Sequence, residues 1–219
     1  MPDFEKSAAH MRLALPRVYP ITDKKLACRE SHLAILKELA RGGARFVQIR
    51  DKTTPMRDLL RDLFRCVEFA DRNGVTLIVN DRCDLALCCG ATGVHLGQED
   101  LPPDAARAIL GRKSIIGLSA HSLTQVRSAQ KMPIQYVGFG PIYPTSTKAD
   151  AAPEVGLRHL AQACRISAVP VVAIGGIGLK QVREVLLAGA RSAAVISALM
   201  KAGSIARQME RFLEEARER

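Results

Sequence analysis

The chain has 219 residues, of which 47% are hydrophobic and 25% charged, so it can bury the core of one domain of ordinary size. Its net charge of +10 at pH 7 suits an anionic partner, either a nucleic acid, a membrane surface or a phosphorylated small molecule. The basic residues are mixed with acidic ones, without an unbroken basic run or an RNA-binding aromatic motif, which argues against a nucleic acid.

The amino-terminal segment 1–16 has acidic residues near its start and no apolar run, so we expect an extension preceding the first strand and not a signal peptide. No stretch reaches the ~18 apolar residues of a membrane span. The six cysteines form no C-x-x-C pair and no zinc spacing with histidine, which favours free thiols in a reducing compartment. We therefore expect a soluble, cytoplasmic protein without a membrane partner.

Eight short apolar runs are rich in β-branched residues and are bounded by Gly, Pro or Asn, which predicts strands. In chain order they span residues 18–22, 45–50, 76–80, 93–96, 114–119, 136–140, 170–175 and 192–197. Segments of helical periodicity lie between them. The clearest cover residues 31–41 and 55–73, and a last helix is predicted over 204–217.

Strands that alternate with helices predict a parallel sheet of the α/β class. Eight of them in about 200 residues indicate a single-domain (β/α)8 TIM barrel, here residues 1–219. An open doubly wound sheet is the alternative, but it would usually carry a G-x-G-x-x-G turn after the first strand, and none is present there. The barrel predicts functional side chains just past the carboxyl ends of the strands.

The motif QIRDK at 48–52 ends the second predicted strand. Alternate residues of a strand share one side, so Gln48, Arg50 and Lys52 are expected to point into the barrel mouth. Two cations and an amide at one edge suit a diphosphate, because Arg can bind two phosphate oxygens at once. The alternative is an ordinary surface strand end with salt bridges.

Oxygen ligands follow the third and fourth predicted strands, in Asn80-Asp81 and Glu99-Asp100. Two carboxylates from neighbouring strand ends can hold Mg²⁺, which keeps several waters and takes its other ligands from substrate phosphate. Both Asp81 and Asp100 could instead cap the helices that follow them, and for Asp100 alone the cap is the simpler interpretation.

Two histidines and a serine also lie at strand ends. His95 could face either side of its strand, and a hydrogen-bonded histidine near the rim is a simpler interpretation than a catalytic base. His121 could be a base or could begin a helix. Ser119 could donate to a phosphate oxygen or a ring nitrogen, or could cap the following helix.

The seventh predicted strand runs into Gly175-Gly176, and the eighth ends at Ile196-Ser197. Glycines allow close backbone approach, so their N–H groups can cradle a phosphate. Barrels of this kind commonly bind phosphate in the loops after strands seven and eight. The sequence therefore predicts a phosphate site between these two loops.

The stretch GPIYPTSTK at 140–148 leaves the sixth predicted strand and presents hydroxyls and one cation between prolines. Thr145, Ser146, Thr147 and Lys148 could together bridge two anionic ligands. A solvated Ser/Thr turn is the alternative.

Taken together, these motifs resemble those of the thiamine phosphate synthase family over nearly the whole chain. The resemblance is carried by YPITD at 19–23, QIRDK at 48–52, VND at 79–81, GVHLGQED at 93–100, GLSAH at 117–121, GPIYPTSTK at 140–148 and VVAIGGI at 171–177. It implies a Mg²⁺-dependent TIM-barrel enzyme that joins hydroxymethylpyrimidine diphosphate to a thiazole phosphate and releases pyrophosphate, through a dissociated pyrimidine cation.

The resemblance also implies roles for individual residues. Those expected to hold the pyrimidine diphosphate are Gln48, Arg50, Lys52, Asn80, Ser119 and Lys148, of which Arg50, Lys52, Ser119 and Lys148 are expected to act in catalysis. Asp81 and Asp100 are expected to bind the metal. Those expected to hold the thiazole phosphate are Thr145, Thr147, Gly176, Ile196 and Ser197.

Three other activities compete with this one. A thiazole tautomerase has the same barrel but would not need the diphosphate and metal residues. A catalytically silent barrel should have lost a charge among Arg50, Lys52, Asp81, Asp100 and Lys148, and all five are present. A barrel that binds nucleic acid should be retained by DNA in a strongly salt-dependent way. Because barrels of this family often dimerise, a homodimer is the assembly to test.

Overall fold

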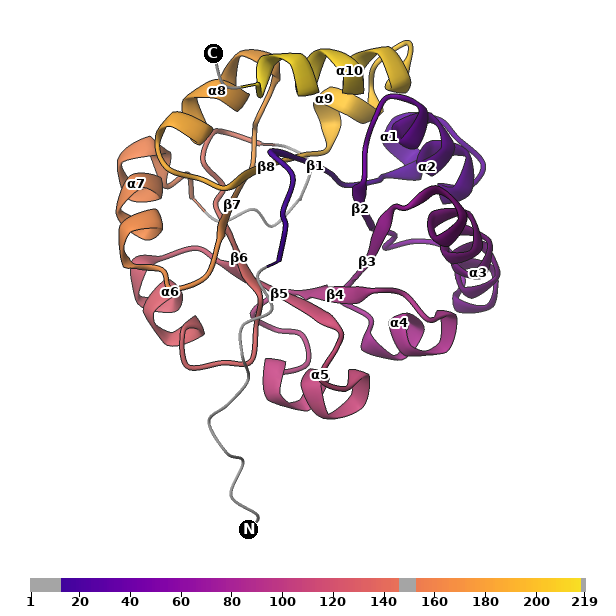
Figure 1. Ribbon diagram of the computed structural model, residues 1–219, viewed down its shortest axis with the longest axis horizontal. Coiled ribbons are helices and arrows are strands. Elements are labelled where there is room, and N and C mark those ends of the chain that lie inside the picture. Colours follow the sequence, from indigo (N-terminus) through magenta and orange to yellow (C-terminus); the bar gives the residue numbers. More distant parts are fainter. Residues whose placement is uncertain (1–12, 146–152, 218–219) are drawn as a thin grey trace.

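Eight parallel strands form one sheet that curls into a barrel, with helices around its outside (Figure 1). The structure is a computed structural model that describes residues 13–145 and 153–217. The strands are β1 (Val18–Pro20), β2 (Phe46–Ile49), β3 (Thr76–Asn80), β4 (Gly93–Leu96), β5 (Ile115–Ala120), β6 (Tyr136–Phe139), β7 (Val171–Ile174) and β8 (Ser192–Val195). The predicted (β/α)8 barrel is confirmed.

The order of the strands is β1-β8-β7-β6-β5-β4-β3-β2, and every neighbouring pair is parallel. A parallel bridge between Ile21 and Gln48 joins the two ends of this order and closes the barrel. Because all strands run the same way, their carboxyl ends meet at one mouth of the barrel.

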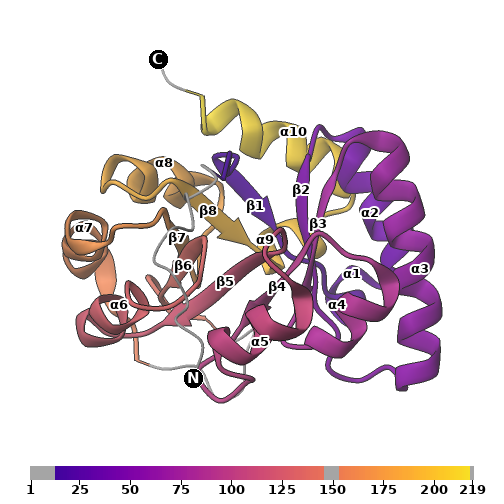
Figure 2. The same ribbon diagram turned by 60° about the horizontal axis from the view of Figure 1, so that its bottom comes forward.

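The helices lie along the outside of the barrel, as the tilted view in Figure 2 shows. They are α1 (Lys24–Ala27), α2 (His32–Arg41), α3 (Met56–Asn73), α4 (Cys83–Cys89), α5 (Pro103–Leu110), α6 (Leu123–Ala129), α7 (Gly156–Ile166), α8 (Leu179–Leu187), α9 (Ser197–Met200) and α10 (Ile205–Glu215). Within the described ranges, no helix is both long and apolar enough to cross a membrane.

Serine caps begin two of the helices that the sequence predicted. The Ser31 hydroxyl accepts a hydrogen bond from the Ala34 N–H at the start of α2, and the Ser204 hydroxyl accepts one from the Arg207 N–H at the start of α10. The last helix, α10, then packs against both α2 and α8 and covers the place where β8 meets β1 (Figure 1). The predicted eighth strand is shorter than expected, because Ile196 already leads into α9.

Apolar side chains fill two layers. The larger one lies between the outer face of the sheet and the helices. The smaller one fills the barrel interior and contains three aromatic rings, Tyr19, Phe46 and Tyr136, in edge-to-face contact. Their centroids lie 4.8–6.5 Å apart, a favourable geometry for ring quadrupoles. The interior is therefore a packed core, and ligands must bind at its rim.

Candidate active site

Residues at the end of β2 alternate between the barrel interior and the outside, as predicted. Gln48 is 2% exposed and donates its amide N–H to the Tyr19 hydroxyl at 2.9 Å. Arg50 lies two residues further, with Nη1 3.5 Å from an Asp23 carboxylate oxygen. Its Nε is buried and has no hydrogen-bond partner in the described part of the chain. Arg50 therefore keeps one buried donor that the described residues leave unsatisfied.

Asp51, between the two cations, faces the opposite way and anchors the loop. Its carboxylate lies 2.9 Å from His32 Nε2 and 3.3 Å from Lys24 Nζ, and it accepts the Thr54 hydroxyl at 2.7 Å. The other nitrogen of the His32 ring is 2.8 Å from the Thr22 hydroxyl. This buried cluster belongs to no predicted site. It holds in place the backbone of the loop that carries Arg50 and Lys52.

Asp51→Asn is expected to lower the free energy of unfolding by about 2–3 kcal/mol at pH 7, because a buried charge network loses its central anion. Burial raises the pKa of Asp51, but hydrogen bonds from His32, Thr54 and Thr53 outweigh it and hold the pKa well below its usual range. The stabilisation is therefore complete above the unfolded pKa, near 4, and is lost as the pH falls below it.

Urea unfolding of both proteins at several pH values measures this effect. The difference in unfolding free energy should shrink between about pH 5 and pH 3. Asp58→Asn, which changes an exposed carboxylate on α3, is the matched control and should be neutral. A difference that stays constant down to pH 3 would contradict the assignment.

Two carboxylates meet where β3 and β4 end. Asp81 follows β3 directly and has a φ of 62°, a left-handed conformation that is uncommon outside glycine. Asp100 accepts the Gly97 N–H at 2.6 Å, and the Asp81 carboxylate acts on it electrostatically. Lys52 Nζ donates to Asp81 from the neighbouring strand end. The structure thus brings together three residues that the sequence predicted for this site.

The pKa of Asp100 is raised, first by burial and also by the neighbouring Asp81 carboxylate, although the hydrogen bond from the Gly97 N–H lowers it. Two carboxylates side by side repel each other, and a cation between them relieves that repulsion. Within residues 13–145 and 153–217, no group of three or more His, Cys, Asp or Glu side chains is placed to hold a metal. A pair of carboxylates nevertheless fits Mg²⁺, which takes its remaining ligands from water and substrate phosphate.

The alternative role of these aspartates as helix caps is wrong. The residue that caps α4 is Arg82, and the residue that caps α5 is Pro102, in both cases without a side-chain hydrogen bond. Asn80 is the last residue of β3, half-buried, and pairs with His95 in the parallel register. Asn80, Asp81 and Asp100 therefore all belong to the barrel mouth.

Ser119 and His95 are joined by a hydrogen bond at the rim. His95 is 7% exposed, and its Nε2 lies 2.9 Å from the Ser119 hydroxyl. His121 Nδ1 is 2.6 Å from the carbonyl oxygen of Gly140. The cap of α6 is Ser122, whose hydroxyl accepts the Gln125 N–H, so neither Ser119 nor His121 has the capping role.

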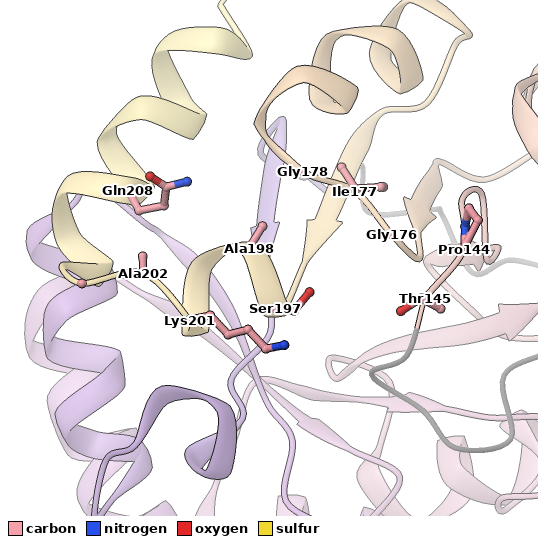
Figure 3. A pocket seen from close by; sticks show the side chains of 11 residues that line it. Pro144, Thr145, Gly176, Ile177, Gly178, Ser197, Ala198, Lys201, Ala202 and Gln208 are labelled. Carbon is pink, nitrogen blue, oxygen red and sulfur yellow. The ribbon is translucent and has the colours of Figure 1, made fainter.

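A pocket of about 600 Å³ opens across the mouth from the carboxylates (Figure 3). Its walls come from the loops after β6, β7 and β8 and from the start of α10. They are formed by Pro144, Thr145, Gly176, Ile177, Gly178, Ser197, Ala198, Lys201, Ala202, Gly203 and Gln208.

Glycine is required at position 176 for two reasons. Its φ is +65°, and a Cβ there would lie 2.5 Å from the carbonyl oxygen of Pro144. The backbone N–H groups of this loop and the amino-terminal end of α8 can then approach an anion directly. The loop therefore offers backbone N–H donors of the kind that a phosphate group accepts.

Three predicted phosphate residues, Thr145, Gly176 and Ser197, line this pocket. Ile196 is not among the lining residues and instead precedes α9. The sequence analysis missed Lys201 and Gln208, which line the pocket from beyond the last strand. In Figure 3 the Lys201 side chain extends toward Ser197.

The predictions for Ser146, Thr147 and Lys148 lie outside the described residues.

The fold and the site define a (β/α)8-barrel enzyme with its polar groups at the carboxyl ends of the strands. Residues 18–199 match the family model described as thiamine monophosphate synthase. The chain therefore belongs to this family.

Curated relatives agree. The chain is 42% identical to the thiamine-phosphate synthase of Albidiferax ferrireducens, over 89% of each protein. It is also 42% identical to that of Myxococcus xanthus, over 94% of this chain and 95% of the relative. The chain is thus a transferase of the thiamine-phosphate synthase type.

Solved structures support the same assignment. The thiamine phosphate pyrophosphorylase from Pyrococcus furiosus superimposes with a TM-score of 0.83 and 34% identity, covering 91% of this chain and 96% of that one. A tryptophan synthase α-subunit, also from Pyrococcus furiosus, superimposes with a TM-score of 0.67 at 17% identity, which shows a shared fold alone.

Proposed function

We propose that this enzyme joins hydroxymethylpyrimidine diphosphate to a thiazole phosphate, giving thiamine phosphate and pyrophosphate in a Mg²⁺-dependent reaction. The observation that supports the proposal is that the barrel mouth carries two separate groups of residues whose chemistry suits an anion. Lys52 lies beside the Asp81–Asp100 pair, with Arg50 two residues earlier in the same strand end, and the glycine-lined pocket is formed by the loops after β6, β7 and β8. A diphosphate and a monophosphate would each find one site.

The diphosphate side suits a leaving group that gains negative charge. In the proposed reaction the bond from the pyrimidine methylene carbon to the diphosphate oxygen breaks, and the electron pair stays on that oxygen. Arg50 and Lys52 are already placed there, so they would stabilise the departing charge more than the bound substrate. Mg²⁺, held by Asp81 and Asp100, would supply Lewis-acid stabilisation of the same charge.

The pocket side suits the second substrate. Its phosphate would bind the backbone N–H groups after β7 and the hydroxyls of Thr145 and Ser197, with the Lys201 ammonium group supplying positive charge. The thiazole nitrogen would then attack the pyrimidine cation with its own lone pair. That step requires no strong base, which agrees with histidines that are hydrogen-bonded to the protein at the rim.

Pyrophosphate release by the purified protein tests the proposal. We expect release only when both substrates and Mg²⁺ are present, with thiamine phosphate formed in equal amount, and no release in EDTA. Folded protein that releases no pyrophosphate under these conditions would contradict the proposal. Binding of the thiazole phosphate alone would then distinguish a tautomerase or a silent binder from an unrelated barrel.

A further inference from the structure

Five polar side chains form one continuous line of hydrogen bonds through the barrel interior, and each comes from a different strand. Gln48 Nε2 donates to Tyr19 Oη at 2.9 Å, and Tyr19 Oη is 2.9 Å from Tyr136 Oη. Tyr136 Oη is 3.0 Å from His95 Nδ1, and His95 Nε2 is 2.9 Å from Ser119 Oγ. We call these five residues the interior chain.

Glycines in two strands leave room for the rings of the interior chain. A Cβ at Gly117 would lie 2.1 Å from Cζ of Tyr136, and one at Gly138 would lie 3.0 Å from Cε1 of His95. Tyr136 and His95 also stack, with ring centroids 5.4 Å apart. The rings are therefore held in one position. A buried line of polar side chains costs folding free energy unless each of its polar groups forms a hydrogen bond.

The direction of the hydrogen bonds follows from counting protons. Burial raises the pKa of both Tyr19 and Tyr136, so each phenol keeps its single proton. Tyr19 accepts from Gln48, and the only other hydrogen-bond partner of its hydroxyl in the described part of the chain is Tyr136, so we assign its proton to Tyr136. By the same assignment the proton of Tyr136 goes to His95 Nδ1, which is then an acceptor.

The same assignment of protons extends to the residues at the rim of the barrel. A neutral imidazole that accepts at Nδ1 carries its proton on Nε2 and donates it to the Ser119 oxygen. The Ser119 hydroxyl proton is then left to donate to a ligand or to water at the mouth. At the other end, the amide nitrogen of Gln48 is committed to Tyr19, which leaves its carbonyl oxygen as an acceptor.

We propose that Tyr19, Tyr136 and His95 are positioning residues that fix Ser119 as a hydrogen-bond donor and Gln48 as an acceptor at the barrel mouth. A donor and an acceptor held at a fixed spacing suit a nitrogen heterocycle with an exocyclic amino group, which offers the complementary pair. Identification of that heterocycle with the pyrimidine substrate rests on the proposed function, whereas the proton order of the interior chain does not.

The His95 tautomer tests the proton order directly. In ¹⁵N-labelled wild-type protein at about pH 8, where an ordinary imidazole is neutral, NMR should show His95 protonated on Nε2 and unprotonated on Nδ1. Tyr136→Phe should turn this single tautomer into a mixture. Tyr143→Phe removes a hydroxyl that donates to Glu184 outside the interior chain, so it should leave the tautomer unchanged.

Kinetics test the positioning role. Tyr136→Phe should lower kcat/KM for the pyrimidine diphosphate about tenfold, while KM for the thiazole phosphate stays within about twofold. If Tyr136 acts through Ser119, adding Tyr136→Phe to Ser119→Ala should cost little more than Ser119→Ala alone.

Two results would overturn the inference. The first is a wild-type His95 that carries its proton on Nδ1. The second is full additivity of the Tyr136→Phe and Ser119→Ala losses. Because the tautomer is measured in wild-type protein without substrate, it remains informative whether or not Tyr136→Phe folds and whether or not the proposed reaction is the right one.

Discussion

Asp81→Asn is expected to lower the Mg²⁺-dependent rate of pyrophosphate release by about 100- to 1000-fold, because a Lewis-acid metal contributes several kcal/mol to the transition state. Asparagine is chosen because Asp81 has a φ of 62°, which asparagine tolerates better than alanine does. The variant should therefore fold like the wild type and lose only the negative charge.

Asp84→Asn is the matched control for this variant. Asp84 lies three positions further along the chain, on the exposed side of α4, and pairs there with Arg82. Its replacement should leave the rate unchanged. Titration with Mn²⁺, followed by its paramagnetic resonance signal, would show separately whether Asp81→Asn has lost metal affinity. Normal turnover together with unchanged Mn²⁺ binding would remove the metal assignment.

The fold could be predicted because parallel strands buried on both faces leave a simple pattern. Runs such as TLIVN at 76–80 are short, β-branched and bounded by polar residues, and the structure places β3 on that same run. The position of polar side chains at the end of β2 could be predicted for a related reason. Two-residue alternation puts Gln48 and Arg50 on one side wherever β2 lies in the barrel.

Contacts between distant parts of the chain could not be predicted in this way. The hydroxyls of Tyr19 and Tyr136 meet across 117 positions, and no local pattern in either strand indicates the partner. Lys201 lines the pocket from the turn after α9, beyond the strand ends where the barrel rule directs attention. The possible capping roles of Asp81 and Asp100 were also wrong. The N-cap residues of α4 and α5 are Arg82 and Pro102, and neither forms a side-chain capping hydrogen bond.

Gly117→Ala is expected to be among the most destabilising single substitutions in the barrel, with a loss of about 3 kcal/mol or more in unfolding free energy. A Cβ at this position in β5 would lie 2.1 Å from Cζ and 2.5 Å from Oη of Tyr136. The Tyr136 ring has little room to move aside, because Tyr19 and Phe46 are in edge-to-face contact with it and His95 stacks on it. Thermal unfolding should shift down by about 6–12 °C.

A second substitution distinguishes the ring clash from a general weakness of alanine in β5. Shortening Tyr136 to leucine should recover part of the stability in the Gly117→Ala background, although Tyr136→Leu alone destabilises the protein by creating a cavity. Gly203→Ala is the matched control, since a Cβ there meets nothing within 4 Å. If Gly117→Ala were as stable as Gly203→Ala, the ring would have room to move, and the fixed geometry on which the interior chain depends would be lost with it.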